Sequence, residues 1–191
     1  MHKFLEYHIY LKKRSILGSI YKKFFLYPLL RLLLGKRYID LGCGIGKMLE
    51  FSPKYSIGLD INEHNINYIV KRKLNAKLIL PNGKLPIEDS SYPSLICDNV
   101  IEHIQDPIFL IKEIKRVLPE NGLLIIGVPM KKGYLRDPDH KVFYDINKLK
   151  KLFCEENKFS LNYYFYLPFP FSFLGKFISQ QTLYISLKNN K

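Results

Sequence analysis

A glycine-rich turn directly after an apolar segment constrains the fold of this chain more than any other feature. The segment 38–41 reads Tyr-Ile-Asp-Leu, and glycines follow at the alternate positions Gly42, Gly44 and Gly46. Glycine permits backbone dihedral angles and a close approach of ligand to backbone that a side chain would prevent. Fourteen residues after Gly46, a second short apolar segment ends at Asp60, where a carboxylate can accept hydrogen bonds from ribose hydroxyl groups. This arrangement predicts an α/β fold that holds a ribose-containing ligand.

The spacing of the glycines separates this turn from two common phosphate-binding loops. In the dinucleotide pattern G-x-G-x-x-G, the third glycine opens a helix beneath a pyrophosphate, whereas Lys47 holds that position here. The sequence contains no G-x-x-x-x-G-K-[ST] pattern of a Walker loop. The observed D-x-G-x-G-x-G resembles the first motif of class I S-adenosylmethionine (SAM)-dependent methyltransferases, whose cofactor has a ribose but no phosphate.

From residue 37 onward, short apolar segments alternate with helical patterns, which predicts a mostly parallel sheet. The predicted strands are residues 37–41, 55–60, 76–80, 94–100, 123–128, 160–167 and 182–187. We therefore expect a Rossmann-like sheet of seven strands, with helices on both faces and an antiparallel last strand. We also expect two regions, a basic N-terminal helical arm packed on the core (residues 1–36) and a SAM-dependent methyltransferase domain (residues 37–191).

Four further segments extend the resemblance to the methyltransferase type 11 family. They are similar to the family segments LPF-x-D-x-SFD, VLEHVxD, LKPGG and THxxxFT, and they follow in the same order. In this sequence they read LPIEDSSY (85–92), VIEHIQD (100–106), VLPENGL (117–123) and DHKVFY (139–144). Together with the glycine turn they cover about residues 37–160, and the resemblance implies that SAM is the cofactor.

The resemblance also implies a role for each matching residue in SAM binding. The three glycines pass beneath the methionine and ribose parts of SAM, Asp60 binds the ribose hydroxyls, and Ile61 packs on the adenine. Asp40 binds the loop backbone or the amino group of the ligand. The remaining implied contacts are Asn82 or Gly83 at the adenine edge, and Asp98 and Asn99 beside the methionine portion. Asn82 departs from the family pattern, because many relatives have an aspartate near this position.

Two histidines are candidate general bases. His103 follows the fourth predicted strand, and His140 lies in an irregular loop that we expect to overhang the acceptor. Either can also be a structural histidine, and Asp139 is a candidate to orient His140. A base is required only for some acceptors: a hydroxyl group must lose a proton, whereas a phosphate or carboxylate needs no base.

The three cysteines, Cys43, Cys97 and Cys154, are too few and too far apart to suggest a disulfide framework or a zinc site. We therefore expect a reducing compartment and no metal site. The start of the sequence does not resemble a signal peptide, and the most apolar stretch, residues 24–34, is shorter than the roughly 20 residues that span a bilayer.

Positive charge is concentrated at the two ends of the chain. Residues 1–37 contribute +8 and residues 146–191 contribute +5 to the net charge of +13, whereas residues 38–145 are neutral. Localised basicity predicts an anionic partner surface. On a membrane, the basic residues that would meet anionic lipid are Lys12, Lys13, Arg14, Lys22 and Lys23.

Aromatic residues gather between the last two predicted strands. Eight of the residues from 163 to 177 are Tyr or Phe. They can complete the core, line an apolar acceptor pocket, or enter a bilayer interface beside Tyr27, Leu29 and Leu30. The sequence leaves these three readings open.

We therefore hypothesise a cytoplasmic SAM-dependent methyltransferase, peripheral at an anionic membrane surface, that methylates an oxygen of a small-molecule, saccharide or lipid-linked acceptor. The alternatives are an RNA-modifying methyltransferase and a non-catalytic SAM-binding regulatory protein. Nucleic acid is the less favoured partner, because the [DNS]-P-P-[YF] loop of amine-methylating enzymes is replaced by Asp98-Asn99-Val100-Ile101. The oligomeric state is left open.

Overall fold

The computed structural model describes residues 2–12 and 16–191. The chain divides into two compact units, residues 1–88 and 89–191. The first unit contains three parallel strands, β1 (Ile39–Leu41), β2 (Ile57–Asp60) and β3 (Ala76–Leu78), with β2 between the other two. Every residue of β1 and β2 is buried, whereas β3 is half-exposed at the edge. Asp60 is therefore the last residue of a buried strand, and its side chain lies at the carboxyl end of the parallel set.

Most helical segments of the first unit precede β1 or follow β2, and one short segment lies between β1 and β2. Asn62 caps the helix after β2, because its side chain accepts a hydrogen bond from the His64 amide at 3.0 Å. That helix, α4, packs on β2 and β3, and the first helix of the chain, α1, packs on α4. The helical segments are α1 (His2–Lys12), α2 (Ile16–Tyr21), η1 (Lys22–Leu26), α3 (Tyr27–Leu34), η2 (Leu49–Phe51) and α4 (Glu63–Lys71).

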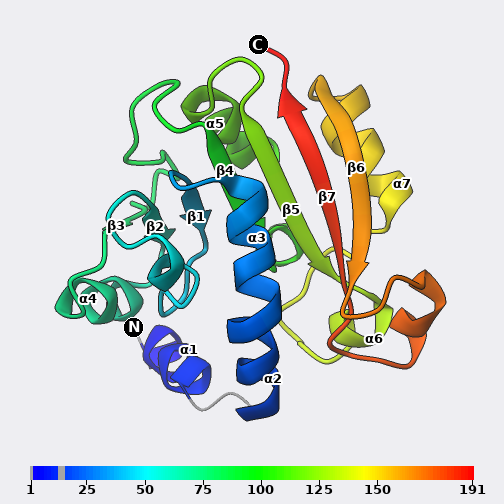
Figure 1. The fold of residues 1–191 in the computed structure, drawn as a ribbon, viewed down its shortest axis with the longest axis horizontal. Coiled ribbons are helices and arrows are strands. Elements are labelled where there is room, and N and C mark those ends of the chain that lie inside the picture. The colour runs from blue at the N-terminus through cyan, green and yellow to red at the C-terminus, as the bar shows by residue number, and fades with distance from the viewer. Residues whose placement is uncertain (1, 13–15) are drawn as a thin grey trace. The chain divides into compact units, whose positions relative to one another are not determined.

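The second unit contains four strands, β4 (Ser94–Asp98), β5 (Leu123–Pro129), β6 (Phe159–Leu167) and β7 (Thr182–Asn189). β4 and β5 are parallel, while β7 is antiparallel to both β5 and β6, and these last three run side by side in Figure 1. β5 is apolar throughout and almost wholly buried, as expected of a central strand. The helical segments are η3 (Ile101–His103), α5 (Ile108–Val117), α6 (Lys131–Tyr134), α7 (Ile146–Lys150), η4 (Lys151–Glu155) and η5 (Ser172–Lys176).

The seven strands have the order β3-β2-β1-β4-β5-β7-β6 in one mixed sheet. This order and the antiparallel β7 confirm the predicted seven-stranded, Rossmann-like fold. The fourth strand is shorter than predicted and ends at Asp98. It ends there because Asn99 adopts a left-handed conformation (φ +56°), and the chain then enters η3. The boundary at residue 36 between an N-terminal arm and a methyltransferase domain stays a prediction.

Candidate functional site

The glycine turn between β1 and η2 depends on backbone angles that favour glycine. Gly42, Gly44 and Gly46 all have positive φ angles, of 75°, 54° and 74°. The amides of Gly42 and Cys43 both donate to the Leu59 carbonyl, at 2.7 and 3.1 Å, which holds the turn against the end of β2. The three predicted glycines therefore lie in one loop beside Asp60, in which Gly42 is exposed, Gly44 is half-buried and Gly46 is buried.

Asp60 connects this loop to the start of α4. Its Oδ2 atom accepts hydrogen bonds from the Gly44 amide at 2.8 Å and from the Asn65 side-chain amide at 3.2 Å. Its Oδ1 atom accepts from the Asn62 amide at 2.8 Å, and the Ile61 amide is a further donor. Burial raises the pKa of the Asp60 carboxyl group above its usual value, although these four donors act in the opposite direction.

The first helix of the chain covers the glycine loop. The buried His8 ring donates from Nδ1 to Asn65 Oδ1 at 2.8 Å, because the other end of the Asn65 amide already donates to Asp60. The Asn62 side chain donates to the Phe4 carbonyl at 2.8 Å. A Cβ atom added to Gly44 would lie 3.1 Å from the Leu11 side chain. α1 therefore supports Asn62 and Asn65 and packs on the turn itself.

These residues fit the adenosyl part of SAM. A carboxylate at the end of the second strand can accept hydrogen bonds from ribose hydroxyls, and Asp60 lies there beside the glycine loop. A carboxylate has about four acceptor positions, and four donors already use those of Asp60. Three of these donors are backbone amides, whereas Asn65 is a side chain that can turn away. Ribose hydroxyls at Asp60 would therefore replace the Asn65 amide first.

The other residues of the first unit that are predicted to bind SAM differ in burial and in local structure. Asp40 is buried within β1, while Ile61, directly after Asp60, has 60% of its side-chain surface exposed. Asn82 and Gly83 form a tight turn after β3, in which Asn82 Oδ1 accepts from the Lys84 amide at 3.1 Å and Gly83 has a φ angle of +73°. Since β3 is parallel to β2, this turn lies at the same edge of the sheet as Asp60.

In the second unit, Asp98 and Asn99 form a rigid pair after β4. The Asn99 side chain donates to Asp98 Oδ1 at 2.8 Å, and the Asn99 amide donates to the Gly127 carbonyl of β5 at 2.8 Å. A side chain at Gly127 would collide with Asp98 and with the Tyr184 ring. Gly127, which sequence reasoning did not single out, therefore provides the space for Asp98.

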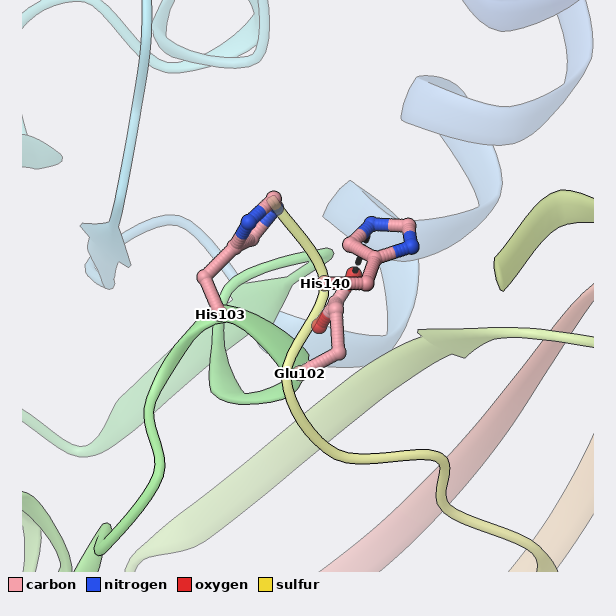
Figure 2. A group of neighbouring side chains, drawn as sticks. All are labelled: Glu102, His103 and His140. Carbon is pink, nitrogen blue, oxygen red and sulfur yellow. Dashed lines mark ion pairs between the residues drawn. The ribbon is translucent and has the colours of Figure 1, made fainter. Parts of the chain in front are cut away.

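His103 and His140 lie close together, and the side chain of Glu102, the residue before His103, lies next to His140. Figure 2 shows the two imidazole rings close to each other, with the Glu102 carboxyl group beneath His140 in this view. The ring centroids of the two histidines are 4.6 Å apart. The Lys141 and Val142 amides both donate to the Glu102 carbonyl, at 2.7 and 3.0 Å, so the backbone of the His140 loop is fixed to η3.

The protonation of His140 is set by its surroundings. Its Nδ1 atom is 2.7 Å from the Tyr134 carbonyl oxygen, which can only accept, so Nδ1 carries the hydrogen. The opposite atom, Nε2, faces Glu102 Oε1 at 3.8 Å and Asp137 Oδ2 at 3.9 Å. The Tyr134 ring stacks on the imidazole at 18°. The ring is therefore held in one orientation with Nε2 directed at carboxyl oxygens.

Burial controls the charges of this cluster. Glu102 is completely buried, and neither of its carboxyl oxygens has a hydrogen-bond partner among the described residues. Burial, together with the charges of Asp98 and Asp137, raises the pKa of Glu102 to about 8. Burial and the neighbouring His140 lower the pKa of His103, so that this ring is neutral at neutral pH. Such a set of groups can take up and release protons near neutrality.

The structure adds partners to the one that the sequence suggested for these histidines. Asp139, the candidate to orient His140, forms a hydrogen bond with His103 through its backbone, and an orienting role for its side chain stays a prediction. Tyr134, Glu102 and Asp137 surround His140. Sequence reasoning did not single out Glu102. The sequence feature that could have indicated Glu102 is its position directly before His103, after a buried strand.

A family model described as a methyltransferase domain matches residues 39–126 of this chain. An uncharacterised protein of Methanocaldococcus jannaschii is 31% identical over 111 residues, which cover 56% of this chain and 48% of that protein. A tRNA U34 carboxymethyltransferase of Campylobacter curvus is 35% identical over 98 residues, covering 46% of this chain and 33% of that protein. The chain thus spans half or less of the length of these two curated relatives.

Solved structures share the fold. A SAM-dependent methyltransferase of Thermotoga maritima, described as a possible histamine N-methyltransferase, superposes with a TM-score of 0.72 at 18% identity, covering 98% of this chain and 99% of that one. A SAM-dependent methyltransferase of Aquifex aeolicus superposes with a TM-score of 0.64 at 16% identity, covering 88% and 92%. Within the part of the chain that the structure describes, none of the helices has the length and apolar character needed to cross a bilayer.

Proposed function

We propose that this chain, in which residues 39–126 match a methyltransferase domain, is a SAM-dependent methyltransferase that transfers a methyl group to an oxygen atom of a small-molecule, saccharide or lipid-linked acceptor. The observation that supports oxygen is the cluster of buried Glu102 with the half-buried His103 and His140. A hydroxyl acceptor must lose a proton as it is methylated, and a positioned base contributes about 10²- to 10⁴-fold to the rate of such a step. An oxygen acceptor requires a proton-accepting atom, and this cluster contains such atoms.

The cofactor would be held by the residues at the carboxyl ends of the strands. When bound, SAM supplies a methyl group that its sulfonium centre already activates. In our proposal, Gly42, Gly44 and Gly46 let the backbone approach it, and Asp60 accepts hydrogen bonds from the ribose hydroxyls. The remaining proposed contacts are Asp40, Ile61, Asn82, Gly83, Asp98 and Asn99.

His140 is the proposed acceptor of the hydroxyl proton. Its Nδ1 hydrogen is engaged by the Tyr134 carbonyl, so the lone pair on Nε2 is available. The proton would pass from the acceptor oxygen to Nε2. The oxygen lone pair would then form the new bond to the methyl carbon as the bond from that carbon to the SAM sulfur breaks, and S-adenosylhomocysteine would leave with the electron pair of the broken bond. In its ionised form, the Glu102 carboxyl group, 3.8 Å from Nε2, would stabilise the resulting imidazolium. His103, which is kept neutral, is the second candidate base.

Replacing His140 with alanine is expected to lower kcat by about 10²- to 10⁴-fold, because the hydroxyl group loses its base. SAM affinity, measured by calorimetry, should stay within about twofold of wild type, because the proposed cofactor contacts do not include this residue. Transfer of radiolabelled methyl groups from SAM to lipid and saccharide extracts measures the rate. His64→Ala, which removes an imidazole near the start of α4, is the matched control. Wild-type turnover by both His140→Ala and His103→Ala would show that neither histidine acts as the base.

Exposed aromatic residues beside lysines support a membrane-bound acceptor. Phe24, Phe25 and Leu32 are 62%, 68% and 76% exposed, and the Lys23 ammonium lies 5.8 Å from the centre of the Phe24 ring. Leu30, which the sequence suggested for the same surface, is instead buried in the core. Lys13 and Arg14, also suggested for it, lie outside the described residues. Apolar rings flanked by cations are typical of segments that enter the headgroup region of a bilayer.

The second unit carries a similar surface in the segment between β6 and β7. Phe169, Phe171, Phe173 and Phe177 are all exposed there, and Lys176 is among them. In the same segment, the Gln181 side chain donates to the Phe169 and Phe171 carbonyls, both at 2.9 Å, which fixes the backbone that presents these rings. An ordered backbone with outward-facing phenylalanines favours a contact surface over a core that is merely incomplete.

The double variant Phe24→Ser/Phe25→Ser is expected to reduce binding to vesicles of phosphatidylglycerol and phosphatidylcholine at least tenfold in co-sedimentation, because two exposed rings are lost. Lys22→Glu/Lys23→Glu should weaken binding further at low salt, since each lysine near an anionic surface contributes about 1 kcal/mol. Phe109→Ser, which removes an exposed ring elsewhere in the chain, is the control. If the wild-type protein does not bind these vesicles at low salt, the membrane part of the proposal is wrong.

An RNA-modifying methyltransferase is the second candidate function. The observations that favour it are the relatives named tRNA U34 carboxymethyltransferase, from Campylobacter curvus and Campylobacter concisus, and the net charge of +13. Methyl transfer to total tRNA that falls steeply with added salt would favour this candidate, because salt weakens contacts with phosphates. SAM binding without transfer to lipid, saccharide or RNA would favour a regulatory protein.

A further inference from the structure

We propose that Glu102, His103 and His140 form a binding site for a divalent transition-metal ion, with Zn²⁺ as the best match. One ligand atom from each of the three side chains lies within 4.8 Å of the others. Ligands around a tetrahedral zinc ion, with bonds of about 2.1 Å, are about 3.4 Å apart. The side chains would therefore need to close by about 1 Å or slightly more, which rotation of His103 and Glu102 can provide.

The carboxyl group of Glu102 points to a ligand that the protein itself does not supply. It is completely buried, and neither oxygen has a hydrogen-bond partner among the described residues. A buried carboxyl group without partners is costly unless something pairs with it. Figure 2 shows this group directed at the His140 ring. The position between these two side chains is where a positive charge would be most strongly bound.

The His140 ring is oriented as a metal ligand would be. Because Nδ1 donates to the Tyr134 carbonyl, Nε2 presents a lone pair to Glu102 Oε1 at 3.8 Å. That distance is too long for a shared proton to form a hydrogen bond between the two atoms. A single ion with bonds of about 2.1 Å to both atoms would have a ligand–metal–ligand angle of about 130° at this separation. Zinc sites with four or five ligands allow such an angle.

The His103 ring is also held by a hydrogen bond to the backbone. This ring forms a hydrogen bond with the Asp139 backbone, which leaves the other ring nitrogen for a ligand. Histidines that bind metals commonly donate their second ring N–H to a backbone carbonyl or a carboxylate, and this fixes the tautomer. Both histidines of the cluster are thus held by backbone groups, and each has one ring nitrogen within 4.8 Å of the other ligand atoms of the cluster.

Two histidines and one carboxylate form a set of ligands found in catalytic zinc sites, which keep a further position open for water or substrate. On binding, the ion would displace any proton from Glu102. The catalytic role of the ion rests on the proposed function: an acceptor hydroxyl in the open position would become more acidic. In the metal-bound protein the two imidazoles are ligands. The cation then activates the acceptor hydroxyl in place of His140.

Metal binding by the full chain can be measured without SAM or acceptor. After treatment with chelator and dialysis, Zn²⁺ titration by calorimetry is expected to show one site per chain. Co²⁺ is expected to give a visible absorption spectrum of nitrogen and oxygen ligands, without the charge-transfer bands of cysteine thiolates. Glu102→Gln and His140→Ala should each weaken Zn²⁺ binding at least tenfold, while His64→Ala should leave it unchanged.

Glu102→Gln preserves the shape of the side chain, so its far-ultraviolet circular dichroism should match wild type and a loss of metal binding cannot be attributed to unfolding. Failure of the wild-type protein to bind Zn²⁺ or Co²⁺ would overturn the metal site, as would binding that neither variant changes. Methyl transfer is assayed separately, with and without chelator. A protein that binds the metal but transfers no methyl group to any acceptor would retain this site and lose the proposed function.

Discussion

Replacing Asp60 with alanine is expected to weaken SAM binding by about 1–3 kcal/mol, or roughly 5- to 150-fold, because the ribose hydroxyls lose a charged acceptor. The same change removes the acceptor of the Gly44 and Asn62 amides and of the Asn65 side chain. Since these donors lie in a mostly buried place, their loss should also lower the free energy of unfolding by about 1–3 kcal/mol. Calorimetry with SAM and thermal unfolding measure the two effects separately.

Asp145→Ala provides the control for this variant. Asp145 also accepts a hydrogen bond from a backbone amide, that of Lys148 at 2.8 Å, as the cap of α7. Its removal is expected to cost about 1 kcal/mol of stability and to leave SAM affinity unchanged. If Asp60→Ala binds SAM as tightly as wild type does, Asp60 is not the ribose ligand, and its carboxylate serves only to join the glycine loop to α4.

The second large effect is expected from Gly44→Val, which should reduce SAM affinity at least tenfold, or about 1.4 kcal/mol. Gly44 has a φ angle of +54°, and a Cβ atom there would meet Leu11 at 3.1 Å. A β-branched side chain is strained at such a φ, by about 1–2 kcal/mol, and would press the loop away from α1. The Gly44 amide would then lose its alignment with Asp60. Calorimetry with SAM measures the change.

Gly35→Val separates backbone strain from loop function. Gly35 also has a positive φ angle, of 76°, but nothing lies within 4 Å of the Cβ position. It should therefore lose a similar amount of stability and keep its affinity for SAM. Equal affinities of the two variants would mean that the glycine loop does not contact the cofactor.

The sequence predicted the parts of the structure that depend on local pattern. The alternation of apolar segments and helices gave the seven strands, and the glycines after Leu41 indicated the loop that binds to the end of β2. These features can be predicted because hydrophobic periodicity and positive φ angles restrict which residue types occur at a position. The same holds for the acid at position 60, which follows a run of apolar residues.

The rest depends on contacts between residues far apart in the chain. His8 supports Asn65, and the Glu102 carbonyl fixes the loop that carries His140. No local pattern marks these pairs, because they arise when a helix or loop returns to a strand end. For the same reason, a metal site was not expected from the sequence, in which only closely spaced cysteines were considered as ligands. Leu30 was among the residues suggested for a membrane-facing surface, but it is buried, because packing rather than composition sets the orientation of α3.

A crystal structure with S-adenosylhomocysteine tests whether the glycine loop and Asp60 hold the adenosyl group of SAM. We expect both ribose hydroxyls within hydrogen-bonding distance of the Asp60 carboxylate, with the Asn65 amide turned away and the homocysteine part along Gly42, Gly44 and Gly46. A structure in which Asp60 keeps its present four donors, while the ligand binds elsewhere or not at all, would contradict it.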